Sequence, residues 1–234
     1  MIAALRALRR LRRNRSGVAM TEFALGAPFL LMAGLWGTEM ANYALVNMKI
    51  GQLAVHIADN ASRIGDTSML QDRKIYEADI NDVIYGAHMQ GGPGINLYEN
   101  GRVIISSLQV APGPSGGTGP QYIHWQRCRG RKPSASTYGN EGDILATGMG
   151  PAGQEVLAMD GDAVIFVQIA YTYQPLISAQ FMGSLDMHSI AAFNVRDDRD
   201  LSQIYQRDPG SPDAVQRCSV FSGTPSISAA GKMT

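Results

Sequence analysis

An uncharged apolar run near the amino terminus constrains the fold of this chain more than any other feature. Residues 23–38, FALGAPFLLMAGLWGT, carry no charge and lie between Glu22 and Glu39. As a helix, this run would extend about 24 Å, which is short of the roughly 30 Å hydrocarbon core of a bilayer. It can still cross a membrane if Glu39 and the residues up to Tyr43 lie at the far interface. We therefore expect a transmembrane segment over about residues 23–43.

The charges around this run are strongly asymmetric. Six arginines precede the first acid in the sequence: Arg6, Arg9, Arg10, Arg12, Arg13 and Arg15. Over the whole chain, 20 basic residues balance 20 acidic ones, so nothing in the overall charge points to nucleic acid as a partner. By the positive-inside rule, Arg9, Arg10, Arg12, Arg13 and Arg15 would hold the amino terminus in the cytoplasm. Everything after the apolar run would then lie outside that membrane.

Three interpretations of the amino terminus compete. A secretory signal peptide fits the basic and apolar regions, but no clear small-x-small cleavage site follows them. A plain signal anchor that is never cut is the second, and a prepilin leader is the third. The position of Glu22 favours the third, because an acid at the edge of the hydrocarbon is costly unless it is paired. Cleavage after Gly17 would give Val18 a free α-amine, and the Glu22 carboxylate could pair with that amine on a neighbouring subunit.

The residues around this point resemble a known family. The segment Gly17-Val18-Ala19-Met20-Thr21-Glu22-Phe23-Ala24-Leu25, followed by Pro28, Leu30, Leu31, Gly37 and Glu39, is similar to the amino-terminal signature of TadE-like proteins. These are minor pilins or pseudopilins of the tight-adherence (type IVb, Flp) pilus system. The resemblance covers about residues 15–58. This chain is far longer than the very short major pilins of that system, which argues against the main filament subunit.

The resemblance implies a processing site and an assembly role. It implies cleavage between Gly17 and Val18 by a prepilin peptidase, and assembly functions for Glu22, Phe23 and Glu39. The implied partners are the peptidase, other pilins, pilus assembly proteins and the membrane. The implied location is the bacterial inner membrane, crossed once, with a periplasmic carboxy-terminal domain that could enter a surface pilus.

The helical pattern continues beyond the membrane. Apolar residues recur at spacings of three, four or five: Leu45, Ile50, Leu53, Ile57, Ala61 and Ile64. This stripe predicts one long helix over residues 18–64, kinked at Pro28, whose second half packs against the following domain. We expect that domain to cover residues 65–205, with a loosely ordered tail over residues 206–234, which are rich in Ser, Pro and Gly.

Alternation and composition predict an α+β domain. A short helix is expected from Ser68 to about Gly86, followed by a turn at residues 91–94. Strands are expected at residues 102–110, 121–127, 162–173 and 189–196. Residues 165, 167, 169, 171 and 173 should share one face. The long connections suggest an antiparallel sheet packed on the long helix.

Cys128 and Cys218 are the only cysteines. If the domain is exported, its compartment permits a disulfide between them, which would tether the tail. Two unrelated buried thiols are the alternative. A catalytic cysteine is not indicated, because no histidine can be placed beside either residue from the sequence.

Other motifs lack the context that their chemistry needs. Residues 148–153 match G-x-G-x-x-G and residues 113–117 match G-x-S-x-G, but neither is set between a strand and a helix. The four histidines are scattered, and the acidic clusters at residues 160–162 and 197–200 lack calcium-loop spacing. We therefore predict no catalytic residue, no metal and no cofactor. The rival hypothesis is a membrane-anchored periplasmic binding or enzymatic domain with an uncleaved signal anchor.

Overall fold

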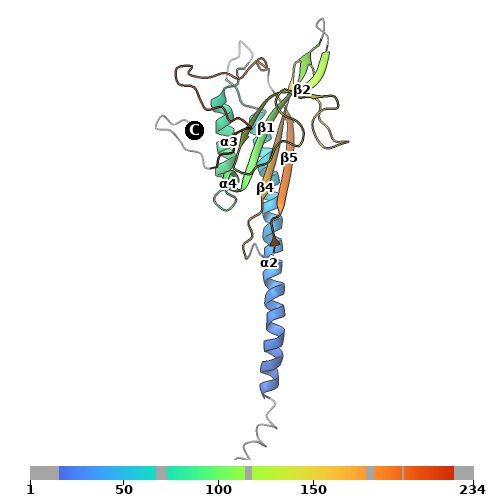
Figure 1. Cartoon of the computed structure of the whole chain (residues 1–234), viewed down its shortest axis with the longest axis vertical. Helices are drawn as coiled ribbons and strands as arrows, with labels where there is room; N and C mark the ends of the chain where they lie inside the picture. Colours follow the sequence, from blue (N-terminus) through green and yellow to red (C-terminus); the bar gives the residue numbers. More distant parts are fainter. Residues whose placement is uncertain (1–15, 67–72, 114–117, 178–181, 197, 224–234) are drawn as a thin grey trace, which may run out of the picture.

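The computed structural model describes residues 16–66, 73–113, 118–177, 182–196 and 198–223. The basic leader with its arginines lies outside the described residues. Helix α2, Ser16–Ala61, is 46 residues long and runs through Pro28 without interruption. Its amino-terminal half projects from the rest of the molecule, and its carboxy-terminal half lies against the domain (Figure 1). The predicted long helix is therefore present, and it ends about one turn before Ile64.

The domain is built on a five-stranded antiparallel half-barrel sheet with the order β3-β2-β1-β4-β5. Its strands are β1 (Gly101–Pro112), β2 (Thr118–Arg129), β3 (Ile144–Leu145), β4 (Ala163–Thr172) and β5 (Asp186–Asn194). The central strand β1 pairs with β2 on one side and with β4 on the other. The four predicted strands and the α+β class are confirmed. The two-residue strand β3 was not predicted.

Helix α3, Glu77–Gly91, begins later than the sequence indicated. Residues before it are extended: the Tyr205 backbone N–H donates to the Ile75 carbonyl at 2.8 Å. The Asp79 carboxylate then accepts from the Tyr76 backbone N–H at 3.3 Å and starts the helix. The helix start predicted at Ser68 is thus wrong for residues 73–76, because the pairing with the chain near Tyr205 overrides their helical pattern. Residues 67–72 lie outside the described ranges.

The main core lies between the sheet, the second half of α2 and α3. Ile50, Leu53 and Ile57 of α2 are each at most 3% exposed, and they pack in one cluster with Ile165, Val167 and Ile169 of β4. The shared face predicted for β4 is confirmed. Leu45, predicted in the same stripe, is 60% exposed. Leu45 therefore faces away from the core, whereas Tyr43 and Val46 pack against it at its edge.

The opposite face of β4 is also buried. Val164 and Phe166 form a second apolar cluster with Leu108, Ile123 and Met149. The ring of Tyr138 packs edge-on against the ring of Phe166, with a centroid distance of 5.4 Å, a favourable geometry for aromatic pairs. The loops between β2 and β4 therefore cover this face, which explains why the strand is an almost continuous apolar run.

The tail is attached to the sheet by the disulfide between Cys128 and Cys218, as predicted. The Cys128 backbone N–H donates to the Gln216 carbonyl at 2.8 Å. The guanidinium of Arg102, which is 1% exposed, donates to the carbonyls of Cys218 at 2.6 Å and Val220 at 3.1 Å. Residues 206–223 form no helix or strand, yet these contacts fix their path across the sheet. The sequence does not indicate this role of Arg102, because an arginine in a strand carries no sign of such backbone partners.

Candidate functional site at the amino-terminal helix

The predicted processing and assembly residues lie on the projecting half of α2. Gly17 has no atom within 4 Å of the position that a Cβ would occupy. Val18 is 51% exposed and Phe23 is 69% exposed. Glu22 is exposed and makes no hydrogen bond or ion pair within the described part of the chain. All four residues are therefore open to contact from another molecule, and none supports the fold of its own domain.

The apolar surface around these residues is unusually large for a water-soluble helix. Over residues 17–38, Gly26 and Ala27 are half-buried, and all the others are exposed. Leu25, Phe29 and Leu30 are each more than 70% exposed. Of the described helices, α2 alone is long and apolar enough to cross a membrane. Apolar side chains exposed on all sides of a helix are typical of a segment whose solvent is lipid.

The free half of α2 ends at Glu39, which is only 2% exposed. Its carboxylate accepts a hydrogen bond from the Tyr173 hydroxyl at 2.5 Å. It also accepts from the backbone N–H groups of Leu176 at 3.2 Å and Ile177 at 3.0 Å. An acid that follows an apolar run is thus bound to the connection between β4 and β5. These bonds offset the cost of burying the carboxylate.

Neighbouring residues complete this junction. Asn42 donates from its amide to the Tyr173 hydroxyl at 2.6 Å, and the Tyr43 ring packs edge-on against the Tyr173 ring at 5.2 Å. Burial, and then the hydrogen bond to Glu39, raise the pKa of the Tyr173 phenol. The phenol therefore stays protonated at neutral pH and can donate to the carboxylate while it accepts from Asn42.

The junction gives Glu39 partners that the sequence does not indicate. Glu39 thus has hydrogen-bond partners within its own chain. Glu22, which is 17 residues earlier, has none in the described residues. Asn42 and Tyr43 also contact the domain. The part of α2 that stands clear of the domain therefore ends at Thr38. Tyr173 is not indicated by the sequence, because only the tertiary fold brings it to Glu39 across 134 positions in the chain.

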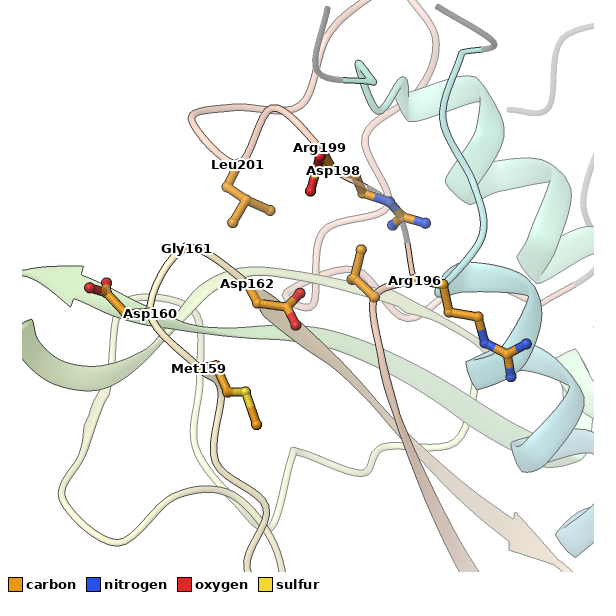
Figure 2. A pocket seen from close by; sticks show the side chains of 9 residues that line it. Met159, Asp160, Gly161, Asp162, Arg196, Asp198, Arg199 and Leu201 are labelled. Atoms are coloured by element: carbon orange, nitrogen blue, oxygen red, sulfur yellow. The ribbon is translucent and has the colours of Figure 1, made fainter. Parts of the chain in front are cut away.

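A hollow of about 360 Å³ lies where the loop before β4 faces the segment after β5 (Figure 2). Asp160 and Asp162 come from the loop, and Arg196 and Arg199 come from the facing segment. Both arginines also contact α2: Arg196 pairs with Asp59 at 3.2 Å, and Arg199 donates to the Ala61 carbonyl at 3.2 Å. The described lining contains three aspartates, Asp160, Asp162 and Asp198, and no histidine, cysteine or serine.

The other motifs noted in the sequence lie in loops or pack against neighbouring side chains. Residues 148–153 form a turn-rich loop in which Gly148, Gly150 and Gly153 have positive φ angles, and no helix opens from it. His88 stacks on Tyr98, and His124 bonds to the Tyr122 hydroxyl. Among the described residues, no three His, Cys, Asp or Glu side chains are grouped as metal ligands would be. Most of the G-x-S-x-G segment lies outside the described ranges.

Comparisons of the chain with protein-family models, with curated proteins and with solved structures gave no match.

Proposed function

We propose that this chain is a TadE-like minor pilin or pseudopilin that takes part in assembling a tight-adherence pilus. In this proposal, α2 crosses the bacterial inner membrane once, the arginine-rich leader stays in the cytoplasm, and the α+β domain lies in the periplasm. A prepilin peptidase cuts after Gly17. The Glu22 carboxylate then pairs with the new α-amine of a neighbouring pilin.

One observation carries this proposal: the exposed, apolar half of α2 presents an unpaired Glu22 five residues after Gly17. A plain anchor has no use for an acid at the edge of the hydrocarbon, because a charge there is costly unless it is paired. An assembly of parallel helices supplies that partner as a protonated amine. The resemblance in residues 15–58 supports the same conclusion independently of the geometry.

The disulfide supports a periplasmic location for the domain. Disulfides persist in the periplasm and are rare in the cytoplasm. The bond between Cys128 and Cys218 therefore fits a domain on the outer side of the inner membrane. The arginines before the apolar run favour the same topology by the positive-inside rule.

The test is the amino-terminal sequence and intact mass of the protein purified from its native membrane. We expect a chain that begins at Val18. Gly17→Leu should block cleavage, whereas Gly26→Leu should not; both glycines lie in α2 with no atom within 4 Å of the place where a Cβ would stand. A wild-type chain that keeps its six arginines would contradict the proposal and favour an uncut anchor. A chain that begins after Thr38 would exclude both.

A further inference from the structure

The connection between β4 and β5 has a composition that is unusual for a loop in water. Residues 174–185, QPLISAQFMGSL, contain no charge. Leu176 is 65% exposed and Ile177 is 42% exposed. Residues 178–181 lie outside the described ranges, and the described ends of the connection run up to Ile177 and onward from Met182. These ends lie beside α2 at the base of the domain, where the free half of the helix begins (Figure 1).

Glu39 holds this connection against the helix. Its carboxylate accepts from the backbone N–H groups of both Leu176 and Ile177. In an apolar surrounding, each of these N–H groups would cost several kcal/mol if it had no partner. The carboxylate therefore satisfies the backbone donors at the point where the side chains are most apolar.

An open apolar groove of about 410 Å³ lies between the connection and α2. Ile177 and Met182 line one side, and Leu31, Leu35 and Trp36 line the other. The groove continues directly into the exposed apolar surface of the helix. Its one charged lining residue among those described, Glu39, already has its hydrogen bonds within the chain. Trp36 lies one turn before Glu39, near the end of the proposed span. Tryptophan is enriched at the membrane–water interface, where the end of a spanning helix lies.

We propose that Leu176, Ile177 and Met182, at the described ends of this connection, form a second membrane contact. Leu176, Ile177 and Met182 enter the boundary between head groups and acyl chains on the periplasmic side, and a lipid acyl chain fills the groove beside Trp36. This inference rests on the proposed membrane span of α2. Interfacial segments are typically buried about 5–10 Å into this boundary, which suits side chains beside the last turn of a spanning helix. The domain is then held to the bilayer at two points, which fixes its orientation above the membrane.

The test uses the full chain in vesicles of phosphatidylcholine and phosphatidylglycerol that contain a phosphatidylcholine with a diazirine on its acyl chain. After irradiation, the labelled residues are mapped by mass spectrometry. We expect label on residues 18–38 of α2 and also on Leu176, Ile177 or Met182. Label on α2 without any on these three residues would overturn the second contact and leave the span intact. Absence of label from α2 would contradict the span, and with it the proposed function.

A pair of variants sharpens the test. The double change Leu176→Asp with Ile177→Asp should reduce the lipid label at the connection at least tenfold and leave the label on α2 unchanged. Leu157→Asp with Met159→Asp is the matched control, because Leu157 is 58% exposed and Met159 is 70% exposed on a different loop. That control should change neither label. Cross-links from the wild-type connection to a second copy of the chain, in place of lipid, would overturn the acyl-chain occupant.

Discussion

The two halves of α2 use similar residues in opposite ways. In the first half, Phe29 is 74% exposed and Leu30 is 73% exposed; in the second half, Ile50 is 0% exposed and Ile57 is 1% exposed. Both sets are apolar and both belong to one continuous helix. The second half has polar residues on its other faces and packs against a sheet, whereas the first half is apolar on all sides and packs against nothing in the described domain.

This difference shows that the two halves of one helix suit different surroundings. The second half obtains its stability from burial against β4 and β5, as an amphipathic helix of a globular protein does. The first half can bury its surface only in lipid or against other helices. Glu39 marks the boundary, because it is the first buried residue of α2 and is bound to the domain. Changes in the two halves should therefore have separable effects.

The largest expected effect on the domain alone comes from the disulfide. Replacing Cys128 and Cys218 together by Ala opens a loop of 90 residues and should lower the free energy of unfolding by about 4–5 kcal/mol. Urea denaturation of the full chain in detergent micelles measures the loss, and reduction of the wild type should reproduce it. The first half of α2 should stay helical and micelle-bound in both cases. An unchanged unfolding midpoint would show that the bond adds nothing to the domain.

The next largest loss of stability is expected from a change in the half of α2 that packs against the core. Ile57→Ala leaves a cavity in the main core and should cost about 2–5 kcal/mol of unfolding free energy. Leu30→Ala is the matched change in the first half and should leave the unfolding free energy of the domain within about 0.5 kcal/mol. The same denaturation experiment compares them. Equal losses would contradict the division of α2 into two independent halves.

A change at the Glu39 boundary between the two halves of α2 should cause an intermediate loss of stability. Tyr173→Phe removes the hydroxyl that donates to the Glu39 carboxylate, and loss of a hydrogen bond to a charged group costs about 1.5–3 kcal/mol. Tyr43→Phe is the control, since it keeps the edge-on ring contact with Tyr173 and should cost less than about 0.5 kcal/mol. Thermal unfolding of both variants in micelles is the measurement. If the two variants unfold alike, the hydrogen bond from the Tyr173 hydroxyl to Glu39 does not stabilise the domain.

The smallest effect on stability should come from Glu22. Glu22→Ala should change the unfolding free energy by no more than about 0.5 kcal/mol, because the carboxylate has no partner in the described residues. The same change should abolish pilus assembly while leaving cleavage after Gly17 intact. Glu22→Asp, which keeps the charge, should retain part of the assembly. Recovery of sheared filaments and the amino-terminal sequence of the variant are the two measurements. Normal assembly by the Ala variant would remove Glu22 from the mechanism.

Strong local patterns were enough to predict most of the fold. The stripe Ile50, Leu53, Ile57 and Ala61 predicted the buried face of α2, and alternation along β4 predicted its core face. Weak patterns, and patterns that tertiary contacts override, were not enough to predict the local structure. β3 has only two residues, too few for a periodic signal. The start of α3 was misplaced because residues 73–76 pair with the distant segment near Tyr205.

Composition and local spacing alone were sufficient for the unburied apolar helix and for four of the five strands of the sheet, and the count of two cysteines was enough to suggest their pairing. Each of these features is recorded within one segment or in a simple count of residues. The end of the free helix was settled only in three dimensions, because Glu39 resembles a membrane-edge acid until the fold brings Tyr173, Leu176 and Ile177 to it. The path of the tail over Arg102 likewise depends on contacts between distant segments. Such contacts follow from how the sheet twists and packs, and no local pattern records them.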